Sequence, residues 1–146
     1  MTENQEKILS LLSRFSDGEY YKIQPASKKQ IQDFKTKAIE RQVGREVIDQ
    51  LVELYEIADN FYCEIVLGFY SCADDTIFEW WDEKELWLGQ RDFNTLRWAN
   101  GKFCLGDAGS ISYSADYECD TLVGLIECCI KEIENAENYD KLKSGE

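Results

Sequence analysis

The chain has 146 residues, of which 44% are hydrophobic and 13% aromatic, and its formal net charge is −13. That length suits one ordinary domain with a real core, and the apolar content excludes a disordered chain. The acidity is concentrated in residues 51–146, which carry seven Lys or Arg against twenty-one Asp or Glu. Such a surface repels phosphate backbones and attracts cationic partners, so we expect no direct binding to nucleic acid.

Membrane and export signals are not apparent in the sequence. Glu64 and Glu127 interrupt the longest apolar stretches, which therefore fall short of the roughly 18 residues that a membrane span needs. The first seven residues have no basic segment of the kind that opens a signal peptide. We expect a cytoplasmic protein that does not associate with membranes.

The cysteines do not form a metal-binding or disulfide pattern. There is no histidine and no C-x-x-C pair, and the six cysteines are Cys63, Cys72, Cys104, Cys119, Cys128 and Cys129. Zinc held by cysteine alone needs four suitably spaced thiolates, and cytoplasmic thiols stay reduced. We expect small core residues, with neither a metal nor a cofactor.

The first half of the chain predicts helices. Residues 4–16 have apolar residues at helical spacing and are expected to end near Asp17-Gly18, and a short strand is predicted over residues 19–23. Ser27 and Gln30 are spaced as a capping box for the next helix. The apolar face of that helix is expected to hold Ile31, Phe34, Ala38 and Ile39. Gly44 then precedes a helix that buries Val47, Ile48, Leu51, Val52 and Tyr55.

The second half predicts strands and one closing helix. Residues 61–70 and 76–81 are rich in β-branched and aromatic residues, and a turn is expected between them. Asn100-Gly101 suits the positive φ angles of a two-residue type I′ hairpin. A turn over residues 106–109 and a strand over residues 111–114 are also predicted.

The closing helix is expected to begin at the cap Asp120. Its apolar stripe is Leu122, Leu125, Ile126, Cys129, Ile130 and Ile133. This order of elements predicts an α+β single domain, with a largely antiparallel or mixed twisted sheet of four to six strands and with N-terminal helices and a C-terminal helix packed on it. Residues 1–18 form the N-terminal helix of that domain, residues 19–138 its body, and residues 139–146 a frayed tail.

Residues 78–91 hold three of the four tryptophans, interleaved with acidic residues. Rigid aromatic rings beside carboxylates suit a surface that binds a basic macromolecule, because the rings supply buried area and the acids supply steering. The alternative is that the tryptophans belong to the core and the acids are ordinary solvated residues. The candidate partner-binding residues are Asp74, Asp75, Glu79, Trp80, Trp81, Asp82, Glu83, Glu85, Trp87 and Asp107.

The sequence offers little for catalysis. A Ser-His-Asp or Cys-His device is impossible without histidine, and residues 105–109 lack the lysine of a phosphate loop. A remote alternative is a glycoside hydrolase or carbohydrate binder, in which two of the acids near Trp80, Trp81 or Trp87 act on a stacked sugar. We expect no catalytic residues and no enzyme activity.

From about residue 20 to 135 the order of features resembles the SUKH superfamily, which includes the fungal Smi/Knr regulators of glucan synthesis and many bacterial relatives. The matching segments are the capped helix Ser27–Ile39, the amphipathic Val47–Tyr55 followed by Asn60-Phe61, Glu85–Leu88, Phe103–Asp107, Ser112–Ser114 and the closing helix Leu122–Ile133. The chain departs from the family at Val43-Gly44, where Leu-Pro is usual. It also departs at Asp59–Phe61, where Asn-Gly-Gly is usual, and in a shortened glycine-rich loop after Gly106-Asp107.

The resemblance implies a non-enzymatic α+β domain that binds other proteins. Bacterial members of the superfamily resemble immunity proteins, which neutralise toxin domains that are often nucleases. It therefore implies a protein partner, a basic toxin domain encoded nearby, for which an acidic inhibitor is physically suitable. The fungal branch implies the alternative, a regulatory or scaffolding module of the type that controls cell-wall glucan synthesis.

Overall fold

The computed structural model describes the backbone of residues 1–15, 23–63, 67–91, 94–107 and 113–143. In chain order the elements are α1 (Glu3–Leu12), the 3₁₀ helix η1 (Ser13–Phe15), α2 (Lys28–Glu40), α3 (Arg45–Ile57), β1 (Tyr62–Cys63), β2 (Leu67–Phe69), the 3₁₀ helices η2 (Asp75–Phe78) and η3 (Trp81–Glu83), β3 (Leu86–Arg91), β4 (Asn94–Ala99), β5 (Lys102–Asp107), β6 (Tyr113–Cys119) and α4 (Leu122–Lys143). Among these residues, no helix is both long and apolar enough to cross a membrane.

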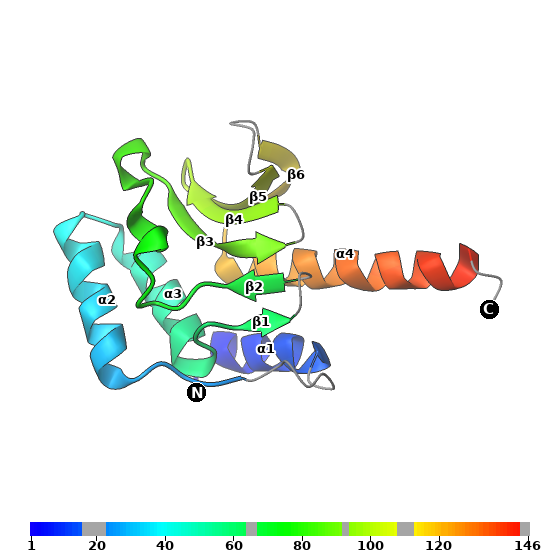
Figure 1. Cartoon of the computed structure of the whole chain (residues 1–146), viewed down its shortest axis with the longest axis horizontal. Helices are drawn as coiled ribbons and strands as arrows, with labels where there is room; N and C mark the ends of the chain where they lie inside the picture. The colour runs from blue at the N-terminus through cyan, green and yellow to red at the C-terminus, as the bar shows by residue number, and fades with distance from the viewer. Residues whose placement is uncertain (16–22, 64–66, 92–93, 108–112, 144–146) are drawn as a thin grey trace.

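Within the described ranges, six strands form one sheet in the order β1-β2-β3-β4-β5-β6 (Figure 1). Each strand lies beside the next strand in the chain, and every neighbouring pair is antiparallel. A register shift between Trp87 and Gly89 marks a bulge in β3. The predicted α+β class, with a largely antiparallel sheet and helices at both ends of the chain, is confirmed.

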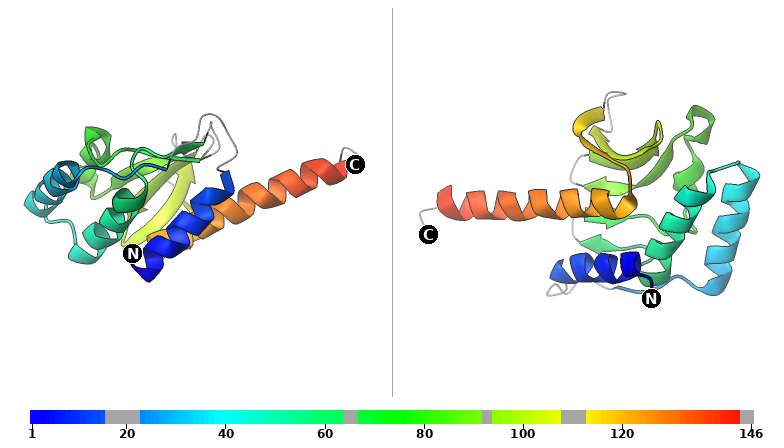
Figure 2. Two further views of the ribbon diagram at one scale, coloured as in Figure 1. Left: turned by 90° about the horizontal axis from the view of Figure 1, so that it is seen from below. Right: turned by 180° about the vertical axis from the view of Figure 1, so that it is seen from behind.

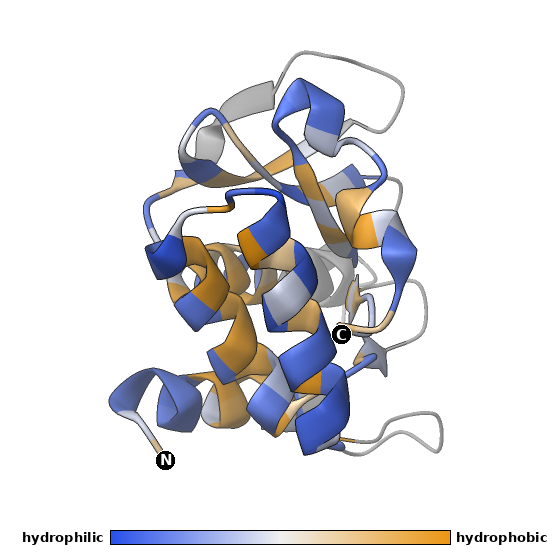
Figure 3. Cartoon of the chain, turned by 90° about the vertical axis from the view of Figure 1, so that its left-hand side faces the viewer, coloured by the Kyte–Doolittle hydropathy of each residue, from blue (hydrophilic) through white to orange (hydrophobic). Residues whose placement is uncertain are grey.

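Helices α1, α3 and α4 lie on one face of the sheet, and α2 packs beside α3 (Figure 2). The strands alternate accordingly: Leu86, Leu88 and Leu96 are buried in the core beneath these helices. The predicted stripes of α3 and α4 are fully confirmed, since all of their residues are buried. In the view onto the left-hand side of Figure 1, α2 is mostly hydrophilic and α3 carries more hydrophobic residues (Figure 3).

Two local signals in the sequence are confirmed in atomic detail. The Ser27 side chain accepts a hydrogen bond from the Gln30 backbone N–H, and the Ser27 N–H donates to the Gln30 side chain, which completes the capping box. Asn100 and Gly101 have φ angles of 54° and 78°, and they join β4 to β5 in a two-residue hairpin. A side chain other than Asn, Asp or Gly is strained at such angles, which explains this residue pair.

The strand predicted over residues 76–81 is wrong, because the segment is helical. Asp74 accepts a hydrogen bond from the Thr76 N–H and thereby caps η2. Ile77 and Phe78 are consecutive and both buried, which a half-buried strand does not allow, since neighbouring side chains point to opposite faces. The stretch predicted as one strand over residues 61–70 contains β1 and β2, which pair with each other.

Several helix details also differ from the sequence prediction. Ile39 is 64% exposed and lies outside the buried face of α2, whereas Phe34 and Ala38 are buried. Thr121 caps α4, because its Oγ1 accepts from the Gly124 N–H at 3.0 Å. The predicted cap Asp120 forms an ion pair with Lys102 instead. Residues 139–143 of the tail that was predicted to fray lie within α4, which continues to Lys143.

Other predictions fall wholly or partly on residues that the structure does not describe. The end of the first helix at Asp17-Gly18, most of the predicted strand over residues 19–23, and positions 108–112 lie outside the described ranges. Gly106, predicted as part of a turn, lies in β5 opposite Tyr113. The predicted strand over residues 111–114 overlaps the start of β6, which runs on to Cys119.

Candidate functional site

The consecutive tryptophans Trp80 and Trp81 lie at the end of the sheet where β3 begins and β4 ends. Trp80 stacks on Trp87, with ring centroids 5.1 Å apart and 22° between the planes. Trp81 stacks on Trp98, with centroids 6.3 Å apart. Trp98 pairs with the core residue Leu86, whereas Trp87 is the next residue along β3. Since adjacent strand residues face opposite sides, the two stacked pairs lie on opposite faces of the sheet.

The outer pair, Trp80 and Trp87, rests on a buried cation. Arg97 is directly opposite Trp87 in β4, and its guanidinium carbon lies 4.4 Å from the Trp87 ring centroid. Glu85 accepts from the Trp87 indole N–H at 3.2 Å, and its Oε1 lies 3.5 Å from the Arg97 Nη1. These contacts fix the Trp87 ring. Trp80 stacks on that ring and is itself 38% exposed. The outer pair is therefore an accessible aromatic surface on a rigid support.

The inner pair, Trp81 and Trp98, is part of the packing. Both residues are partly buried and pack against the hydrophobic core. Trp80 and Trp87 are not among the residues that pack against it. The Trp81 indole N–H donates to the Arg41 carbonyl at 2.8 Å, and the Lys84 ammonium lies 5.0 Å from the Trp81 ring centroid. The sequence left the core and binding roles of the tryptophans open. The structure places Trp81 against the core and leaves Trp80 exposed.

Three exposed carboxylates lie close to Trp80 in the chain. Glu79, Asp82 and Glu83 are exposed and form no ion pair with any described residue. Lys84 adopts the left-handed conformation, with φ 62°, where it ends η3. Its ammonium lies over Trp81. The structure brings Trp80, Glu85 and Trp87 into contact, and Glu79, Asp82 and Glu83 are close to Trp80 in the chain. We call these six residues the acidic tryptophan surface.

Asp74 and Asp75 line a neighbouring open pocket rather than this surface. The pocket has a volume of about 810 Å³ and lies between α2 and η2, with Lys37, Arg41 and Glu79 also in its lining. Asp75 forms an ion pair with Lys37 at 2.9 Å, and Asp74 caps η2. The Arg41 guanidinium lies 4.8 Å from the Phe78 ring centroid. The pocket carries both signs of charge, so its two aspartates contribute less local negative potential than the sequence suggests.

Asp107 is not part of the acidic tryptophan surface. It pairs with Asn94, at the opposite end of β5 from the row that contains Leu86, Trp98 and Phe103. Asp107 lies four residue steps along β5 from Phe103, which is about 13 Å. The Asp107 side chain lies outside the described residues.

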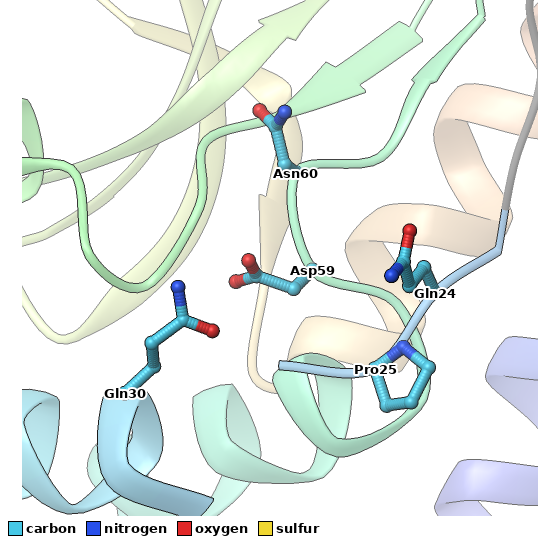
Figure 4. Close-up of a pocket in the computed structure, with 5 residues that line it drawn as sticks. All are labelled: Gln24, Pro25, Gln30, Asp59 and Asn60. Atoms are coloured by element: carbon cyan, nitrogen blue, oxygen red, sulfur yellow. The ribbon is translucent and has the colours of Figure 1, made fainter. Parts of the chain in front are cut away.

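A second, smaller pocket of about 390 Å³ lies where the segment before α2 runs beside the end of α3 (Figure 4). Gln24, Pro25, Gln30, Asp59 and Asn60 line it. The Asp59 carboxylate is already engaged, because it accepts from the Ser71 hydroxyl at 2.7 Å and from the Cys72 N–H at 2.8 Å. Burial, together with the Asp59 charge, raises the pKa of Cys72 to about 12. We interpret Asp59 as a structural acceptor that fixes the following loop.

Arg97 is the central residue that the sequence analysis missed. It is 3% exposed, and a buried arginine is unusual without a specific partner. The available signal was its position three residues before the Asn100-Gly101 turn, between Leu96 and Trp98. Alternation places it on the face opposite those two apolar residues. The register that sets it against Trp87 depends on the β3 bulge, which has no clear signature in the sequence.

Cysteine positions agree in part with the prediction. Cys72, Cys104 and Cys129 are buried free thiols, whereas Cys119 and Cys128 are free but half-buried. The Cys63 side chain is not described. Among the described residues, no three His, Cys, Asp or Glu side chains are grouped as a metal ion would require.

No family model, curated protein or solved structure matches this chain.

Proposed function

We propose that this chain is a non-enzymatic, cytoplasmic protein-binding domain of the SUKH type that neutralises a basic toxin, of the nuclease class, encoded beside it. The observation that carries the proposal is the acidic tryptophan surface, where Trp80 is exposed and its chain neighbours Glu79, Asp82 and Glu83 are exposed carboxylates that form no ion pair with any described residue. The outer face offers the two parts that such an interface needs, a rigid apolar anchor and a local negative field.

The support beneath Trp80 favours binding. An anchor that is already ordered before association loses little conformational entropy when the complex forms. Trp87 supplies the platform on which Trp80 stacks, and Arg97 and Glu85 hold Trp87 in place. Tryptophan in such a setting is the residue type most often found at the energetic centre of protein interfaces.

The charge distribution supports a cationic partner. Residues 51–146 have a net charge of −14, and the acidic tryptophan surface lies within them. A nuclease domain needs a cationic groove for its phosphate backbone, and an acidic surface can occupy that groove and raise the association rate. A neutral partner would gain nothing from this field.

Two departures from the family pattern are conformationally compatible with the family residues. Gly44, where proline is usual, has φ −58°, close to the value that the proline ring imposes. Asn60, where glycine is usual, has φ 54°, in the left-handed region that Asn and Gly tolerate best. The backbone at both positions therefore supports the resemblance to the SUKH superfamily.

The test is reversal of Glu79, Asp82 and Glu83 to lysine, with binding measured to the product of the neighbouring gene. This variant changes the net charge from −13 to −7. We exclude Glu85, because it pairs with the buried Arg97 and its reversal would disturb the fold. We expect association to slow about ten-fold or more at low salt, and the loss to shrink as salt rises.

A matched control separates a local effect from the change in total charge. Asp33, Asp49 and Glu127 are exposed on α2, α3 and α4, and their reversal gives the same net charge. We expect that control to bind with nearly unchanged kinetics. Equal slowing in both variants would show that the acidic tryptophan surface is not the interface. Failure of the neighbouring product to bind, with tight binding to a wall-synthesis or signalling protein, would favour the regulatory alternative.

A further inference from the structure

Two cysteines outside the acidic tryptophan surface face each other. The sulfur of Cys119, the last residue of β6, lies 3.8 Å from the sulfur of Cys128, in the second turn of α4. Both residues are half-buried, unlike Cys72, Cys104 and Cys129, which are buried. This pair therefore combines proximity with access from solvent.

The connection between β6 and α4 produces this proximity. Only Asp120 and Thr121 separate the strand from the helix, and Thr121 caps the helix. Gly124 lies one turn before Cys128, and a Cβ added at Gly124 would lie 3.6 Å from the Cys119 Cβ. Because residues four apart share a helix face, the end of β6 lies against the face of α4 that carries both Gly124 and Cys128.

We propose that Cys119 and Cys128 form a redox modification site, which peroxide or a small disulfide oxidises reversibly to an intramolecular disulfide. A disulfide has an S–S distance of about 2.05 Å, so the two sulfurs must approach by roughly 1.8 Å. Rotation of half-buried cysteine side chains between staggered rotamers changes sulfur positions on this scale. The proposal does not rest on the proposed function.

With hydrogen peroxide as the oxidant, the chemistry is balanced as follows. The thiolate of one cysteine attacks a peroxide oxygen, the O–O bond breaks, and hydroxide leaves, which gives a sulfenic acid. The second thiolate attacks that sulfur, the S–O bond breaks, and the S–S bond forms as a second hydroxide leaves. The two protons released by the thiols convert both hydroxides to water. A thiol reductant restores both cysteines by exchange through a mixed disulfide.

The surroundings slow the first step and favour the second. Burial, and the contact with Cys128, raise the pKa of the Cys119 thiol to about 12, so this thiol stays protonated at neutral pH. In the second step the two sulfurs are already in contact, and this proximity compensates for a low thiolate fraction. Oxidation should accelerate as pH rises, because the thiolate is the reacting form.

The experiment treats the folded full chain with hydrogen peroxide or, separately, with glutathione disulfide, and then blocks the remaining thiols with an alkylating agent. No Lys or Arg lies between Lys102 and Lys131, so trypsin would leave Cys104, Cys119, Cys128 and Cys129 in one peptide. The digestion therefore uses a protease that cuts at Asp and Glu. We expect the loss of two thiols per chain, a peptide linked through Cys119 and Cys128, and full recovery with a thiol reductant.

Single substitutions check the assignment. Cys119→Ala and Cys128→Ala should each abolish the linked peptide, whereas the neighbouring Cys129→Ala should retain it. A thermal melt of each variant confirms that it is folded before oxidation. Sulfinic acid or glutathione adducts at separate sites without the linked peptide would overturn the proposal. So would a disulfide between other cysteines, or a Cys119–Cys128 link that appears only in denaturant.

Discussion

The two stacked tryptophan pairs lie on opposite faces of the same strands and differ in what supports them. The inner pair, Trp81 and Trp98, packs against the hydrophobic core, and the Trp81 N–H is satisfied by a backbone carbonyl of the α2 C-cap, Arg41. The outer pair, Trp80 and Trp87, rests on the side chains of Arg97 and Glu85. Packing against the core therefore partly buries one pair, whereas an ion pair supports the other and leaves it accessible.

This difference shows how consecutive, chemically identical residues acquire separate roles. The chain passes the end of β3 at η3, so that neighbouring side chains reach opposite faces of the sheet. Partial burial against the apolar core stabilises the inner pair, and the hydrogen bond from Trp81 to the Arg41 carbonyl adds one polar contact. The outer pair depends on a polar network, in which each member leaves another unsatisfied if it is removed.

The largest effect is expected from Arg97→Ala, which removes the support of the outer pair. The substitution leaves Glu85, whose side chain is 19% exposed, without this cation and removes the charge beneath Trp87. We expect a loss of about 3 kcal/mol in the free energy of unfolding, measured by urea denaturation. Arg97→Lys keeps the charge without the planar group and should lose less. A loss below about 1 kcal/mol for Arg97→Ala would show that the outer face does not depend on this network.

We expect the second-largest loss of stability from Trp81→Ala, because this substitution removes one ring of the inner stacked pair. Full truncation of a buried aromatic residue costs about 3–5 kcal/mol, and Trp81 is only partly buried, so we expect about 2–3 kcal/mol. Urea denaturation measures the loss, and the Trp98 emission should shift to longer wavelength as its stacking partner is removed. Stability equal to that of the parent would place Trp81 among the accessible residues and remove the distinction between the pairs.

A moderate effect is expected at alkaline pH, where the buried thiols of both faces respond. Burial raises the pKa of Cys104, which lies opposite Arg97, from 9.0 to about 11, and Arg97 partly opposes this rise. Burial raises the pKa of Cys129, beneath the helices, to about 12. The unfolded chain loses these protons near pH 9 and the folded chain keeps them, so stability is fully present below pH 9 and falls as pH rises towards 11.

We expect this fall to be at least about 2 kcal/mol by pH 11, measured by urea denaturation at a series of pH values under reducing conditions. Cys104→Ala and Cys129→Ala should each flatten the dependence on pH. A stability that stays constant from pH 8 to pH 11 in the parent, on a scale of about 0.5 kcal/mol, would contradict the burial of these thiols.

The smallest effect on stability is expected from Trp80→Ala. Its ring is 38% exposed and loses chiefly the stack on Trp87, which corresponds to about 1 kcal/mol or less. If the proposed function is correct, the same variant should speed dissociation of the complex at a cost of about 2 kcal/mol or more in binding. A large loss of stability without a specific loss of binding would make Trp80 a structural residue like Trp81.

The local features of the fold were predictable where a short motif determines the backbone. The Ser27–Gln30 capping box, the Asn100-Gly101 hairpin and the stripes of α3 and α4 all depend on contacts between near neighbours. The prediction was wrong over residues 76–81, since an aromatic-rich run was assigned to a strand although Asp74 caps a 3₁₀ helix there. Ile39 was placed in the core by spacing alone, at the last turn of α2, where no other element covers it.

The candidate site was only half predictable for a different physical reason. The acids and tryptophans of residues 78–91 are visible as a composition, but their separation onto two faces depends on pairing between β3 and β4. Arg97 and Lys84 contribute the cations that contact the rings, and neither has a local signature. Asp107 was grouped with the site by its residue type, although the strand carries it to the far end of the sheet.

Helix α4 gives the molecule an uneven distribution of mass. Its 22 residues span about 33 Å, and among the residues whose side chains the structure describes, the buried apolar stripe of α4 runs as far as Ile133. The last ten residues of α4 extend about 15 Å beyond Ile133, past the ends of the strands (Figure 1). Because an α-helix is stiff, the projecting end of α4 rotates together with the domain as one rigid body. The radius of gyration therefore exceeds the roughly 15 Å of a spherical chain of this length, and rotational diffusion is slower about the axes perpendicular to α4 than about its own axis.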